Sequence, residues 1–159
     1  MNAVATQTST KTITSADVQA GLAAGFFGGL AEVAWIAITQ NNAAGVARGV
    51  IGTIFPSLAA SPNAVALGVT AHMLIALALG VALAVGVRWF MSKVASPAKA
   101  FAVFASLIAI WAINFFVVLP AWNPEFVTLV PYGVSLVSKA LFGVAAAFTL
   151  LGMYRRGKA

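Results

Sequence analysis

Four polar side chains stand alone within long apolar stretches of this chain: Glu32, His72, Asn114 and Lys139. Ionisable groups inside a hydrocarbon layer are costly, and they usually face the interior of a helix bundle or a water-filled cavity. A carboxylate, an imidazole and an ammonium at one depth could relay protons or bind a small polar ligand. They could instead pair with one another and fix the register of the helices, which would make them structural. At the level of sequence, both interpretations stay open.

The elements that carry these residues are predicted to be membrane-spanning helices. The chain has 159 residues, of which 62% are hydrophobic and 8% are charged, whereas soluble domains are about a quarter charged. Thr14 and Asp17 have the spacing of a capping box, which predicts that a helix begins near Ser15. Apolar runs near the ~20 residues that cross a membrane predict four spans, at about 18–39, 64–87, 100–119 and 133–153. The expected fold class is therefore an all-α, integral membrane four-helix bundle.

A shorter apolar segment separates the first two spans. Asn41 and Asn42 can cap a helix at about 42–56, and its apolar residues fall largely on one side. Pro56 is expected to disturb its end. This pattern predicts a short helix lying in the membrane interface, and a re-entrant segment packed against the bundle is the alternative.

Basic residues are distributed unequally between the two sides of the predicted bundle. One side holds Lys11, Arg88, Lys93, Lys99, Arg155, Arg156 and Lys158, and the other holds Arg48. By the positive-inside rule, both termini are expected to be cytoplasmic. Candidates for an outer-surface site are Arg48, Trp122 and Glu125. The expected organisation is a disordered cytoplasmic tail at 1–14, a transmembrane domain at 15–154 and a basic cytoplasmic tail at 155–159.

Under this topology the four polar residues share one depth, roughly 8–12 Å below the outer boundary at a rise of 1.5 Å per residue. Small residues repeat on the same helix faces as Glu32, His72 and Lys139, so these three are expected to face neighbouring helices. Asn114 has bulkier neighbours, and its direction stays open. The predicted helix-contact faces are Gly21, Gly25 and Gly29 on the first span, Gly68 and Gly80 on the second, and Gly143 on the fourth.

Composition and residue types narrow the function classes. The net charge is +6, yet the basic residues flank apolar runs, which is typical of orientation signals and not of nucleic-acid binding. Disulfides and thiolate metal sites are excluded because the chain has no cysteine. His72 is the only histidine, so haem is a weak interpretation, no metal site is predicted and no cofactor is required. No catalytic triad is expected, because Asp17 lies on the opposite side of the membrane from His72.

Three segments carry a family resemblance. They are Gly-Val-Thr-Ala-His-Met at 68–73, the outer loop with its prolines and Phe126, and Ser-Lys-Ala-Leu-Phe-Gly-Val at 138–144. Together they resemble the YagU-like bacterial inner-membrane proteins. The resemblance implies a bacterial inner membrane and assigns no activity, cofactor or residue role.

Three functions follow in order of preference. The first is a small non-enzymatic inner-membrane protein, an accessory or assembly subunit that packs against a larger membrane complex. Its expected partners are membrane lipids and another membrane protein or further copies of itself. The second is a small oligomeric transporter or proton-linked channel that uses Glu32, His72 and Lys139. The third is a haem- or quinone-binding redox subunit based on His72, with Trp111 at the edge of a ligand pocket.

Overall fold

Four long helical segments form the body of the protein, and each is long and apolar enough to cross a membrane. The computed structural model describes residues 12–91 and 93–156, so the parts of the predicted tails at 1–11 and 157–159, with Lys11 and Lys158, lie outside the described residues. The long helices are α1 (Ser15–Thr39), α3 (Ala64–Phe90), α4 (Ser96–Ile113) with its continuation, and α7 (Tyr132–Arg156). No strand occurs in the described ranges. The predicted all-α, four-helix membrane fold is confirmed.

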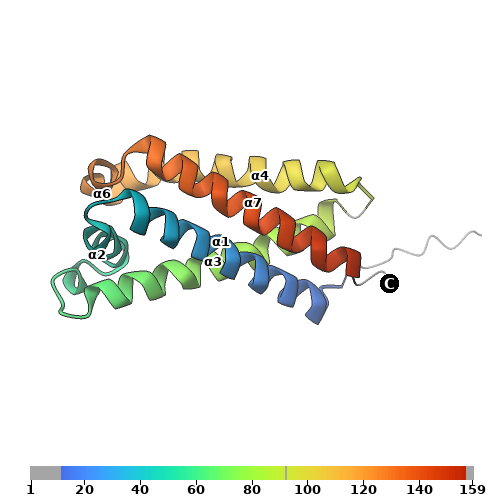
Figure 1. Ribbon diagram of the computed structural model, residues 1–159, viewed down its shortest axis with the longest axis horizontal. Helices are drawn as coiled ribbons and strands as arrows, with labels where there is room; N and C mark the ends of the chain where they lie inside the picture. The colour runs from blue at the N-terminus through green and yellow to red at the C-terminus, as the bar shows by residue number, and fades with distance from the viewer. Residues whose placement is uncertain (1–11, 92, 157–159) are drawn as a thin grey trace, which may run out of the picture.

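The long helices pack in an open arrangement, with α1 between two neighbours (Figure 1). Helix α3 lies along one side of α1 and α7 along the other, while α4 packs along α7. Helices α3 and α4 scarcely touch, so the bundle is open between them. The first described helix begins, and the last ends, at one end of the bundle, here called the termini end; the opposite end is the cap end (Figure 1).

The helix boundaries follow local sequence signals. Thr14 caps α1 in a full capping box with Asp17, so the predicted start at Ser15 is confirmed. The helices extend beyond the spans predicted from apolar residues alone, because a helix can continue past the hydrocarbon layer. Thus α3 runs to Phe90, and α7 includes Arg155, which was expected in a basic tail.

Glycines allow the backbones of α1 and α3 to approach closely. A Cβ on Gly80 of α3 would overlap the backbone of Gly21 and Gly25 on α1. A Cβ on Gly29 would lie 2.7 Å from the Cβ of Ala76. These contacts leave no room for side chains, which is the geometry that small-residue repeats permit in membranes.

Two further glycines seat aromatic rings in the grooves of neighbouring helices. A Cβ on Gly28 of α1 would lie 2.8 Å from the ring of Phe142 on α7. A Cβ on Gly143 of α7 would lie 2.9 Å from the ring of Phe104 on α4. The series α1–α7–α4 is thus held by rings packed on glycine, whereas α1 and α3 meet through their backbones.

A short helix, α2 (Ala43–Ile54), lies across the cap end (Figure 1). It begins after Asn42, whose side-chain oxygen accepts a hydrogen bond from the Gly45 N–H at 2.9 Å, so the predicted Asn42 cap is confirmed. The helix is shorter than the predicted range of 42–56, because a separate 3₁₀ turn, η1 (Pro56–Leu58), begins at the proline. The backbone of Ala47 rests against Gly68 of α3.

The third membrane-crossing segment changes helix type near its cap end. Helix α4 passes into a π-helical stretch, η2 (Asn114–Val118), and then into α5 (Leu119–Trp122). Pro120 has no N–H to donate to the preceding turn, and a π-helical turn accommodates such a break. The segment therefore spans 96–122 where 100–119 was expected, and the following loop at the cap end contains another short helix, α6 (Pro124–Leu129).

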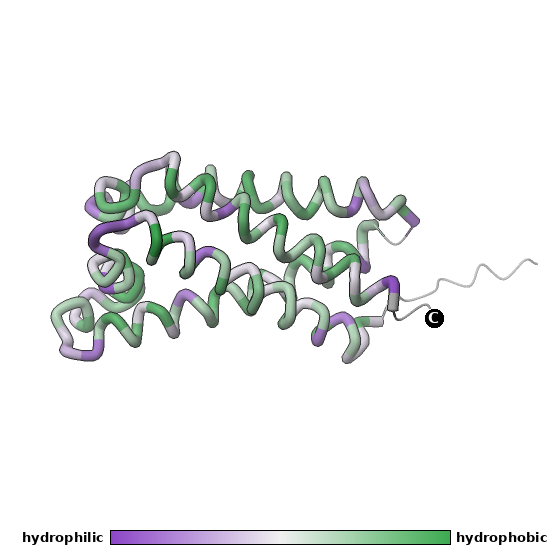
Figure 2. Tube along the Cα trace, viewed as in Figure 1, coloured by the Kyte–Doolittle hydropathy of each residue, from purple (hydrophilic) through white to green (hydrophobic). Residues whose placement is uncertain are grey.

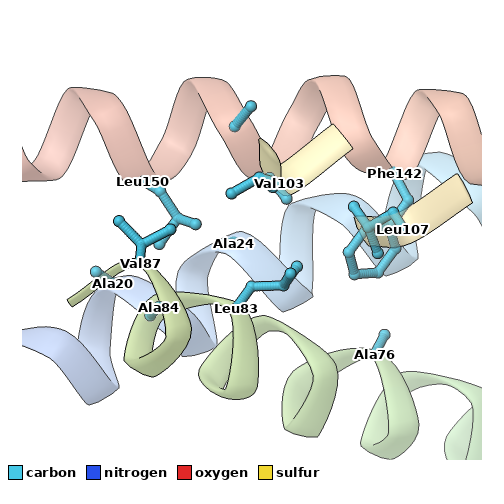
Figure 3. Close-up of a cluster of buried hydrophobic side chains, with 12 residues drawn as sticks. Ala20, Ala24, Ala76, Leu83, Ala84, Val87, Val103, Leu107, Phe142 and Leu150 are labelled. Carbon is cyan, nitrogen blue, oxygen red and sulfur yellow. The ribbon is translucent and has the colours of Figure 1, made fainter. Parts of the chain in front are cut away.

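The larger cluster of buried apolar side chains lies in the half of the bundle nearer the termini. Figure 3 shows its side chains. Alanines of α1 and α3 face one another there, and larger side chains from α4 and α7 cover them. Leu107, Phe142 and Leu150 are almost fully buried. Hydrophilic residues gather mainly toward the two ends (Figure 2). The exceptions inside the long helices are the residues considered next.

Candidate functional site

Three of the four predicted polar residues meet at one point between α1, α3 and α7. Lys139 Nζ lies 2.8 Å from Glu32 Oε1, and His72 Nε2 lies 3.5 Å from Glu32 Oε2. Glu32 is 5% exposed, and the two partners are partly covered. We call these three residues the cap-side cluster.

The position of α1 between α3 and α7 explains why Glu32 reaches both partners. Gly28 and Gly29 precede it by one turn, and they bring Phe142 of α7 and Ala76 of α3 against the same stretch of α1. One carboxylate oxygen can then face each neighbour. The glycine repeat and the carboxylate therefore belong to one local arrangement.

The hydrogen-bonding capacity of the cap-side cluster is not used up. Among the described residues, His72 Nε2 is the only buried side-chain nitrogen or oxygen without a hydrogen bond, and its contact with Glu32 is 3.5 Å long. Lys139 Nζ lies 4.9 Å from the centre of the Phe142 ring, a cation–π contact. An ammonium has three donors, so the ion pair with Glu32 and this ring leave at least one available.

A cavity of about 700 Å³ adjoins the cluster in the cap-end half of the bundle. That volume falls within the range of about 300–1,000 Å³ that is usual for small-molecule sites. Its walls come from α1 to α7 with η2 and are mainly aliphatic and aromatic. The polar side chains that line it are Glu32, Thr53, His72, Asn114, Ser135, Ser138 and Lys139, and the aromatic ones are Trp111, Phe115, Phe126 and Phe142.

The cavity reaches the open side of the bundle between α3 and α4. Ile75, Ile110 and Ile113 line it and are 54%, 40% and 58% exposed. In a membrane, such apolar side chains at mid-helix face hydrocarbon. At the cap end, by contrast, α2 and α6 contact one another, and Asn123 Nδ2 donates to Thr53 Oγ1 at 2.8 Å. The cavity therefore has an opening, here called its mouth, toward the side of the bundle.

Asn114, the fourth predicted polar residue, stays apart from the other three. It lines the same cavity from the first position of η2, and its side chain is exposed. No hydrogen bond from this side chain occurs among the contacts of the described residues. An unpaired amide facing hydrocarbon is costly. Asn114 is therefore a polar group at the mouth, not a member of the cap-side cluster.

Two serines near Lys139 were not singled out as site residues. Ser135 Oγ accepts a hydrogen bond from Trp111 Nε1 at 3.1 Å and donates to the Tyr132 carbonyl at 3.0 Å, which fixes the indole at the cavity wall. Ser138 is buried and lines the cavity. The available signal was their spacing, since Ser135 precedes Lys139 by one helical turn.

The three outer-surface candidates lie away from the cluster. Arg48 donates to the carbonyl of Ser61 at 3.3 Å and contacts that of Ala59 at 3.5 Å, so it ties α2 to the loop before α3. Trp122 is 77% exposed, and Glu125 is exposed on α6. Within the described part of the chain, none of the three lines the cavity.

A second polar cluster joins the same three helices at the termini end. Asp17 of α1 lies 3.4 Å from Arg88 Nε of α3 and accepts a hydrogen bond from the Tyr154 hydroxyl of α7 at 3.4 Å. That hydroxyl is also 3.3 Å from the Ala84 carbonyl. Sequence reasoning assigned Asp17 to the helix cap alone and missed this termini-side cluster.

Comparison with known proteins adds no assignment: no protein-family model, no curated protein and no solved structure matches the chain. Across the residues that the structure describes, no three potential metal ligands from His, Cys, Asp and Glu lie together. The cavity and the cap-side cluster are therefore the features from which a function can be argued.

Proposed function

We propose that this chain is a small, non-enzymatic multi-pass membrane protein that binds a lipid-soluble small molecule in its cavity. The observation that carries the proposal is the pairing of a mainly apolar cavity of about 700 Å³ with a buried cluster that retains hydrogen-bonding capacity. Pockets of this kind, with few polar groups in an apolar wall, are typical of ligand sites. Of the three functions predicted from the sequence, this one is most similar to the small transporter.

The open side of the bundle supports a ligand that arrives from the membrane. The mouth lies between α3 and α4, where exposed isoleucines surround it, and α2 with α6 covers the cap end. A molecule dissolved in the bilayer would reach the cavity without crossing water.

A cavity-filling variant tests the proposal. The full chain and Val46→Phe would be purified in a mild detergent, and native mass spectrometry would record bound small molecules. Val46 is 7% exposed and lines the cavity, so a phenyl ring there takes up ligand space. We expect a bound non-protein mass in the unchanged chain that is reduced or lost in the variant.

The matched control is Gly86→Ala, because a Cβ at Gly86 meets nothing within 4 Å. It should retain the bound mass. Equal small-molecule content in the unchanged chain and in Val46→Phe, with both proteins folded, would contradict the proposal.

The proposed location is a bacterial inner membrane with both termini in the cytoplasm. Support comes from the basic residues near the termini end, such as Arg88, Lys99 and Arg155, under the positive-inside rule. The family resemblance favours the same membrane. Because the chain has no cysteine, single-cysteine variants Lys93→Cys and Glu125→Cys can be labelled in intact cells by a membrane-impermeant thiol reagent. We expect labelling at position 125 only, and the reverse pattern would invert the topology.

An accessory or assembly subunit is the second candidate function. The outer face of α4 and η2 favours it, since α4 packs mainly along α7, and Phe101 of α4 and Phe116 of η2 are exposed at 74% and 58%. A helix of another membrane protein could cover this face. Reproducible co-purification of a membrane protein from native membranes, lost in Phe101→Ala/Phe116→Ala, would support this role.

A further inference from the structure

The groups around the cavity narrow the chemistry of its ligand, an inference that rests on the proposed function. We propose that the ligand carries a neutral, flat ring with carbonyl oxygens on an apolar tail, the chemistry of a membrane quinone. The ring would lie in the cavity, with one carbonyl oxygen toward Lys139 and the tail leaving between α3 and α4. The proposal concerns binding and includes no electron transfer.

The charge of the cluster favours a neutral head group. The Glu32 carboxylate and the Lys139 ammonium are 2.8 Å apart and compensate one another, and His72 adds a charge only when it is protonated. An anionic head group beside Lys139 would also approach Glu32, and a cationic one beside Glu32 would approach Lys139. A neutral head group with an acceptor oxygen avoids both repulsions and can still accept a hydrogen bond from Lys139.

The positions of the polar groups favour more than one acceptor on the ligand. Lys139 lines the cavity from α7, and Asn114 lines it from η2 at the mouth. Both side chains can donate hydrogen bonds. Carbonyl oxygens at two edges of one ring would match polar groups on two walls, whereas a simple acyl chain offers neither group an acceptor.

The aromatic wall favours a flat ring. Trp111 and Phe115 line the cavity, and their rings are stacked with centroids 5.7 Å apart and an interplanar angle of 27°. The hydrogen bond from Trp111 Nε1 to Ser135 holds the indole in place. A planar ligand can pack on such a surface with a small loss of conformational entropy, and aromatic pairs prefer offset stacking.

The open side of the bundle accounts for the tail. Ile75, Ile110 and Ile113 surround the mouth and are exposed toward the hydrocarbon of a membrane. Only the ring then has to fit within about 700 Å³. A long apolar tail can remain in the bilayer.

Quenching of tryptophan fluorescence in the full-length protein in lipid nanodiscs tests this inference. The probe is decyl-ubiquinone, and the matched probe without oxygens is decylbenzene; dodecanoate serves as an anionic probe. We expect saturable quenching by decyl-ubiquinone that Trp111→Phe removes in large part. The double variant Glu32→Gln/Lys139→Met replaces the ion pair with uncharged side chains of similar size, and we expect its Kd to be at least about tenfold higher, the loss of one good hydrogen bond.

Each outcome decides between separate claims. Saturable quinone binding that weakens in the double variant supports the inference. If decylbenzene bound as tightly as decyl-ubiquinone, or dodecanoate bound more tightly, the quinone-type head group would be overturned. The proposed function would still stand. If no probe binds and Val46→Phe has the same small-molecule content as the unchanged chain, the proposed function fails as well.

Discussion

The two polar clusters of this bundle use similar chemistry at opposite ends and differ in what surrounds them. Each joins a carboxylate on α1 to a cation on a neighbouring helix. In the termini-side cluster, Asp17 is 1% exposed and Thr14 donates to it from both its backbone N–H and its hydroxyl, at 2.9 Å and 2.7 Å. In the cap-side cluster, Glu32 has the ion pair with Lys139 and a long contact with His72, beside a cavity.

The difference separates a structural polar cluster from a candidate site. Around Asp17, two hydrogen bonds from Thr14 and the contact with Arg88 satisfy the carboxylate, which lies beside the close-packed alanines of α1 and α3. Around Glu32 there is both space and spare capacity, since His72 Nε2 has no hydrogen bond. Buried ionisable residues in a membrane are functional candidates, but the type of residue alone does not tell these two clusters apart.

The largest expected effect comes from removing one carboxylate in each cluster. Glu32→Leu leaves Lys139 uncompensated in an apolar setting, and breaking a buried pair this way costs about 3–5 kcal/mol of unfolding free energy. Asp17→Leu should cost less, because the Arg88 side chain is 41% exposed and can turn outward. Titration with SDS in mixed micelles would measure both values.

The double variant Glu32→Leu/Lys139→Met provides the control. It removes both charges, so most of the stability lost in Glu32→Leu should return. If Asp17→Leu were the more damaging change, or if the double variant were no more stable than the single one, the assignment of the tighter ion pair to the cap-side cluster would be wrong.

A second prediction concerns the α1–α3 contact that positions both clusters. In Gly80→Ala the new Cβ would overlap the backbone of Gly21 and Gly25, so neither partner can yield by rotating a side chain. We expect a loss at the upper end of the about 1–3 kcal/mol that overpacking costs. Gly86→Ala on the same helix should be neutral or stabilising by up to about 1 kcal/mol, since alanine is the better helix former.

Equal effects of the Gly80 and Gly86 substitutions on SDS-induced unfolding would show that α1 and α3 are further apart than described. If Gly80→Ala alone lost stability and also lost its ligand, the same backbone contact would support both the termini-side cluster and the cap-side site.

A third prediction compares the space at the two ends directly. Ala84 is 0% exposed in the packed half, and Ala84→Leu should cost about 1–3 kcal/mol through overpacking. Val46→Phe adds a ring at the cavity wall and should cost less than about 1 kcal/mol, because the ring can enter the cavity. Thermal unfolding in detergent would rank the two variants, and the opposite ranking would mean that the cavity is filled by protein side chains.

The sequence predicts the architecture well because hydropathy and capping act locally. The apolar runs located the four spans, and Thr14 and Asn42 marked helix starts. Regular rise along each helix also placed Glu32, His72 and Lys139 at one level, where the structure brings them together. Each of these inferences depends only on properties of a single helix.

What the sequence did not predict depends on the distances between helices. The gap between α3 and α4, and with it the cavity, results from α4 packing mainly on α7. The termini-side cluster was missed because Arg88 and Tyr154 each had a sufficient local explanation, as an orientation signal and an interface aromatic. The π-helical turn that sets the direction of Asn114 also arises where a proline meets tertiary packing.

The smallest expected effects come from one polar substitution in each cluster, and they separate the clusters by function. Tyr154→Phe removes a hydroxyl whose hydrogen bonds are long, at 3.3 and 3.4 Å, so the cost should stay near the lower end of about 0.5–1.5 kcal/mol. His72→Phe removes an imidazole whose Nε2 makes no hydrogen bond, and its stability should change by less than about 1 kcal/mol.

Decyl-ubiquinone quenching distinguishes the two variants. It should be unchanged in Tyr154→Phe and weaker in His72→Phe, whose larger apolar ring lies at the cavity wall beside Glu32. If only Tyr154→Phe bound decyl-ubiquinone more weakly, the roles assigned to the two clusters would be reversed. The presence of a cavity beside a polar cluster would then not determine which cluster binds a ligand.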